Sequence, residues 1–236
     1  MRTSSIIRLC TAFLLLGGVW VAYTQMGSQP AKLDTIKVKD DLFVIHNNIV
    51  PGNSTALVTN EGVILVDDKF EVDHDGIMAE LKKITDKPLK YVINTHHHAD
   101  HSGGNAKMYD SGAQIISTAN ARKNILEKRQ PNAPPNVLPA RIVFTDETSV
   151  FLGGKEVRAH HYGRGHTNGD AVIYFPLLKV VHTGDLMSGA TPLIDYNGGG
   201  SVVEWPKTLD AVMQGNLLLF SKLFEVFNGE FHRIFD

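Results

Sequence analysis

The feature that most constrains this chain is the sequence His-His-His-Ala-Asp-His at residues 96–101, directly after apolar residues 91–94 that predict a short buried strand. Because that strand stops at Thr95, the next side chains lie on an irregular turn and can converge instead of alternating between two faces. Imidazoles and carboxylates are ligands of borderline cations such as Zn²⁺. We therefore interpret the turn as part of a metal site, with a surface cluster of histidines as the alternative. The ligands expected from this turn are His96, His98, Asp100 and His101.

Two later segments supply further side chains of the same types. His166 precedes the strand-like residues 171–175, so it lies at a junction of loop and strand and can face the same cavity. Residues 179–185 read as an apolar strand that ends in Gly-Asp. A carboxylate at such a strand end is placed to bridge two cations, which makes Asp185 the candidate bridge.

These three motifs, in this order, resemble the metallo-β-lactamase-fold superfamily of hydrolases, whose members share His-x-His-x-Asp-His, a later Gly-His, and an Asp or Cys after another strand. The resemblance runs from about residue 33 to about residue 214. It implies an α/β fold, a four-layer αββα sandwich. It also implies one or two zinc ions, which lower the pKa of a bound water to about 7. The ligands it implies are His96, His98 and His166 for a first zinc, and Asp100 and His101 for a second, with Asp185 shared. Asp100 takes a second, catalytic role as the group that orients the attacking water.

The residue at position 185 departs from part of that superfamily. Its β-lactamases use Cys or a Ser-type residue near this position, whereas its thioesterases and lactonases use Asp, so Asp185 points away from a standard β-lactamase. The only cysteine is Cys10, upstream of the expected domain, and no cysteine ligand is expected.

The C-terminal part of the sequence is a second departure. Relatives carry a last zinc-binding His in a Gly-His motif, and this chain has no Gly-His after residue 166. His232 is the one histidine beyond Asp185, and we leave open whether it replaces that ligand or is a solvent-exposed terminal residue. Residues 214–232 are rich in Leu and Phe, which leaves open whether the natural end was lost and the sandwich is incomplete there.

Length and charge fit a single enzyme domain. A chain of 236 residues, 43% of them hydrophobic, can bury one substantial core. The formal net charge of −2 gives no basic footprint, so a small-molecule substrate is expected and nucleic acid is not.

The first thirty residues have the pattern of an export signal. Arg2 and Arg8 precede the apolar residues 9–23, a stretch shorter than the ~20 residues that span a bilayer comfortably. We expect a signal peptide at residues 1–30, a hydrolase domain at residues 31–236, and a periplasmic or secreted protein. An uncleaved segment that anchors the protein in the membrane is the alternative.

The periodicity of the remaining residues supports the helix-covered, two-sheet sandwich that the resemblance implies. The expected strands are residues 41–46, 55–59, 62–67, 91–94, 114–116, 150–151, 156–160, 171–175 and 179–185, and the expected helices are residues 74–85, 105–109, 118–128 and 202–213. Asp67 resembles an acid that supports the metal turn in the superfamily, with an ordinary strand-end acid as the alternative. His97 lies between the expected ligands and is predicted to point outward.

The sequence therefore predicts a zinc-dependent hydrolase that opens a lactam, lactone, ester or thioester. Three alternatives stay open: a β-lactamase that acts on antibiotics, a truncated metal-binding remnant with little activity, and a di-iron redox enzyme of the same superfamily. The redox enzymes work with a flavin domain, for which this chain has no room.

Overall fold

The computed structural model describes residues 29–47, 51–130, 137–188 and 192–215, and the backbone of residues 224–227 and 230–233. Residues 1–28, which make up nearly all of the expected export signal, lie outside the described residues. A bilayer-spanning helix would need a longer apolar stretch than any helix in the described part of the chain provides.

The first sheet has seven strands in the order β1-β2-β3-β4-β5-β6-β7. The strands are β1 (Asp34–Lys39), β2 (Leu42–His46), β3 (Ser54–Val58), β4 (Val63–Val66), β5 (Leu89–Ile93), β6 (Gln114–Thr118) and β7 (Ile142–Phe144). β1 to β4 pair antiparallel, and β4 to β7 pair parallel. Parallel neighbours need crossover connections, and helices make them here: α2 (His74–Ile84), α4 (Asn105–Asp110) and α5 (Ala119–Leu126).

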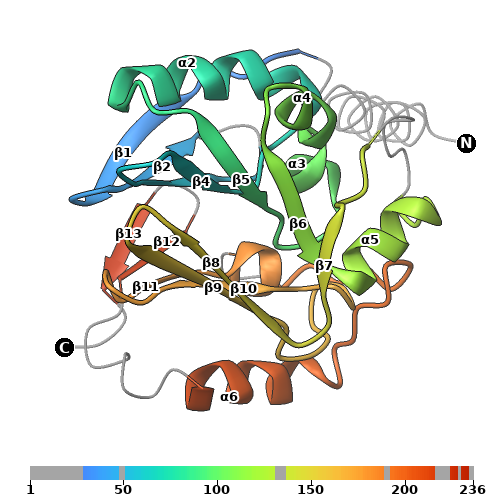
Figure 1. Cartoon of the computed structure of the whole chain (residues 1–236). Coiled ribbons are helices and arrows are strands. Elements are labelled where there is room, and N and C mark those ends of the chain that lie inside the picture. Colours follow the sequence, from blue (N-terminus) through green and yellow to red (C-terminus); the bar gives the residue numbers. More distant parts are fainter. Residues whose placement is uncertain are drawn as a thin grey trace, which may run out of the picture.

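The second sheet has four antiparallel strands in the order β11-β10-β9-β8. They are β8 (Glu147–Leu152), β9 (Lys155–His160), β10 (Val172–Phe175) and β11 (Val180–His182). The helix α6 (Trp205–Gly215) covers the outer face of this sheet, while α2 and α4 lie over the first sheet (Figure 1). The layers therefore follow the order helix, sheet, sheet, helix, which confirms the expected sandwich.

Three buried clusters hold the layers together. Leu57, Ile64, Ile93 and Ile173 belong to the cluster between the two sheets, all at most 2% exposed. A second cluster joins α2 to the first sheet, and a third joins α6 to the second sheet through Trp205. Each fully buried aliphatic side chain of this kind contributes about 1.5–3 kcal/mol through removal from water.

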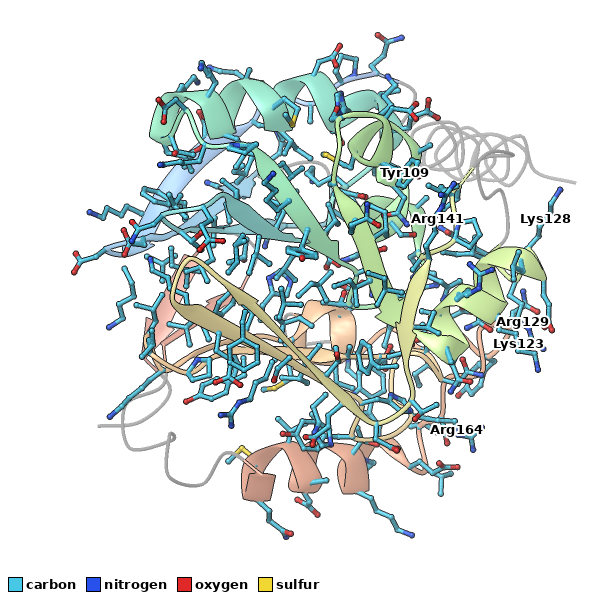
Figure 2. The ribbon with its side chains drawn as sticks, in the orientation of Figure 1. Tyr109, Lys123, Lys128, Arg129, Arg141 and Arg164 are labelled. Atoms are coloured by element: carbon cyan, nitrogen blue, oxygen red, sulfur yellow. The ribbon has the colours of Figure 1, made fainter. Side chains whose placement is uncertain are left out.

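The strands β1 and β7 were not predicted from the sequence. Both lie at edges of the first sheet: β1 is half exposed and carries only two apolar residues among six, and β7 is apolar but only three residues long. β7 pairs parallel with β6, and directly before β7 the guanidinium carbon of Arg141 lies 4.1 Å from the ring centre of Tyr109 (Figure 2). The helix α6 begins at Trp205, three residues later than expected, with Pro206 in its first turn.

Four shorter elements complete the described residues. They are η1 (Glu71–Asp73), α3 (Ala99–Ser102), η2 (Gly184–Met187) and a hairpin of β12 (Phe224–Phe227) and β13 (Glu230–Arg233). His232 lies on β13, and its side chain is outside the described residues, so its role as a ligand stays open.

The fold brings the ligand-bearing segments to one place. Asp67 follows β4, and residues 96–101, here called the histidine turn, follow β5. These two strands are adjacent and parallel, so their C-terminal ends share one edge of the sheet. His166 precedes β10 and Asp185 follows β11, so the second sheet contributes from its own adjacent strands. The candidate site therefore lies where the strand ends of both sheets meet, the usual place for a site in an α/β protein.

Candidate metal centre

Three imidazoles converge at the ends of β5 and β10. The rings of His96, His98 and His166 lie with their centroids 4.7–4.8 Å apart, at interplanar angles of 75–89°. His96 is 1% exposed and His166 is 3% exposed. One ligand atom from each ring and one from Asp185 all lie within 4.8 Å of one another. These four residues, here called the first donor group, are ligands that the sequence predicted for a first zinc and its bridge.

A second donor group lies beside the first and shares Asp185. It consists of Asp100, His101 and Asp185. Nε2 of His101 lies 3.4 Å from Oδ2 of Asp100 and 3.3 Å from Oδ1 of Asp185. The other carboxylate oxygen of Asp185 lies 3.7 Å from Nε2 of His166. Asp185 thus faces both donor groups, and its role as a bridge between two ions stays a prediction.

The hydrogen bonds around the four rings decide which nitrogens face the centre. Nδ1 of His166 lies 2.6 Å from the carbonyl oxygen of Leu193, and Nε2 of His98 lies 2.8 Å from Oδ2 of Asp195. Both partners only accept, so these two nitrogens carry the protons. The remaining nitrogens, His98 Nδ1 and His166 Nε2, then face each other at 3.0 Å with lone pairs. Two lone pairs at that distance repel unless a cation lies between them.

Further unpaired atoms fit the same interpretation. Nε2 of His96 and Nε2 of His101 are buried and have no hydrogen-bond partner. Leaving such a buried polar atom unpaired costs about 1–3 kcal/mol. Burial, together with the neighbouring histidines, lowers the pKa of His96 well below 6.5, so its lone pair is available at neutral pH. Nitrogen and carboxylate donors in this arrangement suit zinc, and the residues present therefore fit a metal.

His101 is held from behind by Asp67. Its Nδ1 donates to Oδ2 of Asp67 at 2.7 Å, and the same carboxylate accepts from the backbone N–H and the hydroxyl of Thr95 at 2.7 and 2.8 Å. Asp67 is fully buried. Burial alone would raise the pKa of Asp67, but the charges and hydrogen bonds of His101 and His182 hold it at about 2. Asp67 therefore supports the metal turn, as the sequence predicted, and is more than an ordinary strand-end acid.

The backbone of Asp100 is fixed by a segment that sequence reasoning did not single out. The Nζ of the fully buried Lys69 donates to the carbonyl oxygens of Pro51 and Gly52. Gly52 has a φ of +79°, and a Cβ atom built there would lie 2.0 Å from the carbonyl oxygen of Asp100. Only glycine allows this approach, so residues 51–52 pack directly against the metal turn.

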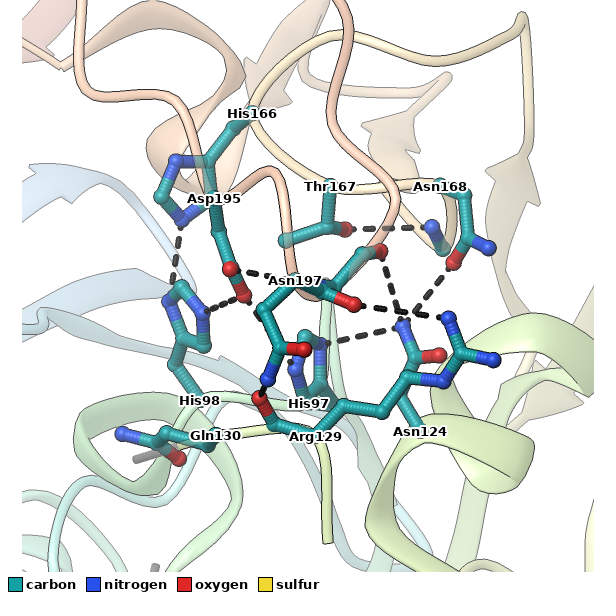
Figure 3. A network of polar contacts seen from close by, with 12 residues as sticks. His97, His98, Asn124, Arg129, Gln130, His166, Thr167, Asn168, Asp195 and Asn197 are labelled. Carbon is teal, nitrogen blue, oxygen red and sulfur yellow. Dashed lines mark hydrogen bonds and ion pairs between the residues drawn. The ribbon is translucent and has the colours of Figure 1, made fainter. Parts of the chain in front are cut away.

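The prediction for His97 was wrong. Its side chain is buried, with the residue 2% exposed, and its Nε2 lies 3.6 Å from Oδ2 of Asp195 (Figure 3). Nδ1 of His97 lies 3.4 Å from the side-chain nitrogen of Asn124 on α5. The turn after β5 packs between α5 and residues 192–200, so a side chain between two ligands does not reach solvent.

Asp195 was also missed by the sequence reasoning. It lies 97 residues from His98 in the chain, in a Gly-rich segment where an isolated acid is typical of an ordinary turn. Burial would raise the pKa of Asp195, but hydrogen bonds from His98 and Gly198 hold it at about 2. Asp195 is therefore an ionised acceptor beside the first donor group.

Comparison with known proteins places these features in a family. Residues 47–211 match the Metallo-beta-lactamase superfamily. The chain is 30% identical over 160 residues to metallo-beta-lactamase IND-1 of Chryseobacterium indologenes, a match that covers 67% of this chain and 64% of that relative, less than two thirds of its length. It is 25% identical over 196 residues to metallo-beta-lactamase type 2 of Elizabethkingia meningoseptica, with 80% of this chain and 76% of that protein covered.

Solved structures share the fold at lower identity. A metallo-beta-lactamase from Pontibacter korlensis has a TM-score of 0.70 at 18% identity and covers 81% of this chain and 89% of its own. The metallo-beta-lactamase FIM-1 from Pseudomonas aeruginosa in its mono-zinc form has a TM-score of 0.69 at 19% identity, with 83% and 87% covered. These likenesses establish the common architecture.

The role of Asp67 can be tested through the pH dependence of stability. We expect Asp67→Asn to lower the free energy of unfolding of the metal-free protein at pH 7 by about 2–3 kcal/mol, since it removes the charge that His101 faces. The pKa of Asp67 is below its ordinary value of 3.8, so this contribution is fully present above that pH and is lost as the pH falls toward about 2. Urea unfolding between pH 7 and pH 3 measures the difference between wild type and variant.

The matched control is Asp86→Asn, an exposed acid whose replacement should change stability by no more than about 0.5 kcal/mol. The assigned role would be contradicted if the difference in free energy of unfolding between wild type and Asp67→Asn did not become smaller as the pH falls.

Proposed function

Because this chain belongs to the metallo-beta-lactamase superfamily, we propose that it is a zinc-dependent hydrolase that opens a carbonyl-containing bond of a small molecule. The observation that carries the proposal is the position of Asp185 between two donor groups, 3.7 Å from Nε2 of His166 and 3.3 Å from Nε2 of His101. A structural zinc site needs one closed set of about four ligands. Two adjoining groups with a shared carboxylate are typical of a catalytic site.

The residues divide between two ions. His96, His98 and His166 would hold the first zinc, and Asp100 and His101 would hold the second, with Asp185 shared. Zinc bound there would lower the pKa of a water molecule to about 7 and polarise the substrate carbonyl.

Asp100 is the group that we assign to orienting the attacking water. Its side chain is 14% exposed, so it is not sealed in the core. Burial would raise the pKa of Asp100, but the charge of His101, whose Nε2 lies 3.4 Å from Oδ2 of Asp100, holds that pKa below 3.8. An ionised carboxylate at this point accepts a hydrogen bond from water and can receive its proton.

The substrate binds, in this proposal, along a cavity that opens beside the second donor group. Polar residues from both sheets line it near the ligands, among them Asn53, Thr55 and His182. Apolar side chains of β1, β2 and β11 form its other wall. Such a lining suits a partly apolar molecule with a polar reactive group, which fits a lactam, lactone, ester or thioester.

A β-lactam substrate is the second candidate function. The curated relatives at 25–30% identity are named metallo-beta-lactamases, which favours it. The residue at position 185 favours a thioester or lactone substrate instead, because the resemblance implies Cys or Ser there in the β-lactamases and Asp in the thioesterases and lactonases. Chromogenic lactam, lactone and thioester substrates, assayed side by side on zinc-loaded protein, distinguish the two.

Export of the protein is a separate proposal. The order of Arg2, Arg8 and the apolar residues 9–23 supports a signal at residues 1–30 followed by a folded domain from residue 31, in the periplasm or outside the cell. Mass measurement of the intact protein recovered from each cell fraction tests both the removal of this segment and the alternative of an uncleaved anchor.

Zinc titration tests the metal assignment. We expect one tight zinc and a second that binds at least about tenfold more weakly, because the first donor group offers four ligand atoms and the second offers three, one of them shared. His96→Ala should abolish the tight equivalent. The control His160→Ala should not, since that ring stacks on Tyr162 away from both donor groups. Competition with a chromophoric chelator measures both affinities.

The same titration settles the part played by His232. If this histidine is a bystander, His232→Ala leaves both affinities unchanged. Two equally tight zinc ions in the wild type, with one lost in His232→Ala, would overturn the expected difference between the sites.

The catalytic role of Asp100 gives a kinetic prediction. We expect Asp100→Asn to lower kcat by about 10²–10⁴-fold on the best substrate found, because the amide cannot take a proton from water. The tight zinc should remain, since three imidazoles are untouched. The control Asp110→Asn, an exposed residue at the end of α4, should keep the wild-type rate. Wild-type turnover in Asp100→Asn would refute the assignment.

A further inference from the structure

The imidazole of His98 is engaged at both nitrogens. Nδ1 lies 3.0 Å from Nε2 of His166, inside the first donor group, and Nε2 lies 2.8 Å from Oδ2 of Asp195, outside it (Figure 3). A neutral imidazole can carry its proton on either nitrogen, and a half-turn of the ring would place a carbon where a nitrogen faces the donor group. The carboxylate of Asp195 removes this freedom, because an ionised acid only accepts and therefore keeps the proton on Nε2. Nδ1 is left with its lone pair toward the donor group.

Asp195 is itself held in place before any metal binds. Its second carboxylate oxygen accepts from the backbone N–H of Gly198 at 2.9 Å. The backbone N–H of Asp195 donates to the carbonyl oxygen of His166 at 2.9 Å, and its own carbonyl accepts from Gly200 at 2.8 Å. A Cβ on Gly198 would lie 2.3 Å from Oδ2 of Asp195, so only glycine leaves room for the carboxylate in this position.

The segment that carries Asp195 also orients a second ligand. We call residues 192–200 the acid loop; its Leu193 carbonyl accepts from Nδ1 of His166 at 2.6 Å. The loop is tied to α5, where the side-chain amide of Asn124 donates to the carbonyl oxygen of Gly198 at 3.1 Å. Two of the three imidazoles in the first donor group thus take their orientation from one loop, which a neighbouring helix holds.

We propose that Asp195 is a positioning residue that fixes the proton and the orientation of the His98 imidazole, and that the acid loop thereby sets the metal affinity of the first donor group. The proposal rests on the proposed metal-dependent function. It assigns Asp195 no contact with the metal or with substrate. A carboxylate or carbonyl behind a metal-binding imidazole makes the ring a better donor, and loss of such a partner costs about 10–100-fold in metal affinity.

Zinc affinity in a set of four variants tests the proposal. We expect Asp195→Ala to weaken the tight zinc by about 10–100-fold. Asp195→Asn should weaken it less, because the amide oxygen can still accept from Nε2. The control Asp210→Asn, an exposed acid on α6, should leave it unchanged. Asp195→Ala made in a His98→Ala background should add no further loss, because Asp195 then has no ring to orient.

Nitrogen NMR of the metal-free protein gives a readout that a purely structural role would not move. Wild-type His98 should show the proton on Nε2 only, and Asp195→Ala should show a mixture of both tautomers. Should Asp195→Ala fail to fold, Asp195→Asn carries the test: a weakened zinc with an unchanged unfolding transition supports the proposal, and an unchanged zinc affinity overturns it.

The outcomes separate this proposal from the proposed function. Wild-type protein that binds no zinc defeats the metal-dependent function itself. Tight zinc in wild type and equally tight zinc in Asp195→Ala defeats the role of Asp195 alone. If the loss of zinc affinity in Asp195→Ala adds in full to the loss in His98→Ala, the role of Asp195 is also defeated, since the two residues then act independently.

Discussion

The candidate site depends on one constraint: each imidazole of the two donor groups has its outer nitrogen hydrogen-bonded to an acceptor. The acceptors are Asp195 for His98, Asp67 for His101, the Leu193 carbonyl for His166, and the Thr95 hydroxyl for His96 at 3.1 Å. Each outer proton is therefore fixed, and the inner nitrogens of His96, His98 and His166 direct lone pairs at a common space. Such convergence is unfavourable without a cation, so metal binding and stability of the site are linked. The same arrangement that costs free energy in the metal-free protein provides the affinity for metal.

The fold supplies this constraint by bringing together acceptors that are distant in the chain. The ends of β4 and β5 place Asp67 behind the histidine turn, and the two sheets face each other across a core that is almost fully buried. The second sheet then contributes His166 and Asp185 from the ends of adjacent strands. The buried Lys69 and Gly52 fix the backbone of the turn from the remaining side. No single segment holds the donor atoms in place by itself. Contacts from several segments together fix their positions, although most of these atoms lie on loops.

Much of the fold and all the proposed ligands followed from local sequence, because strands, helices and the histidine turn are marked by the spacing of neighbouring residues. The edge strand β1 escaped prediction because it is half exposed and mostly polar, and β7 because it has only three residues. His97 was placed outward because the packing of α5 against the turn is not visible in residues 96–101. Asp195 escaped because its meaning depends on a contact with a residue 97 positions away. Local sequence motifs thus indicate the proposed ligands, whereas the residues that accept hydrogen bonds from those ligands are recognised only in the tertiary structure.

The proposed zinc chemistry depends on imidazoles that buried acceptors direct toward one point. X-ray absorption at the zinc edge tests this dependence most directly. Protein loaded with one equivalent of zinc should show about three imidazole nitrogens at about 2.0–2.1 Å, with the outer scattering that imidazole rings produce. Because His98 is held by Asp195 at 2.8 Å, its ring should remain in this set after extensive dialysis. A spectrum in which zinc is bound by oxygen atoms with one imidazole or none would contradict the account.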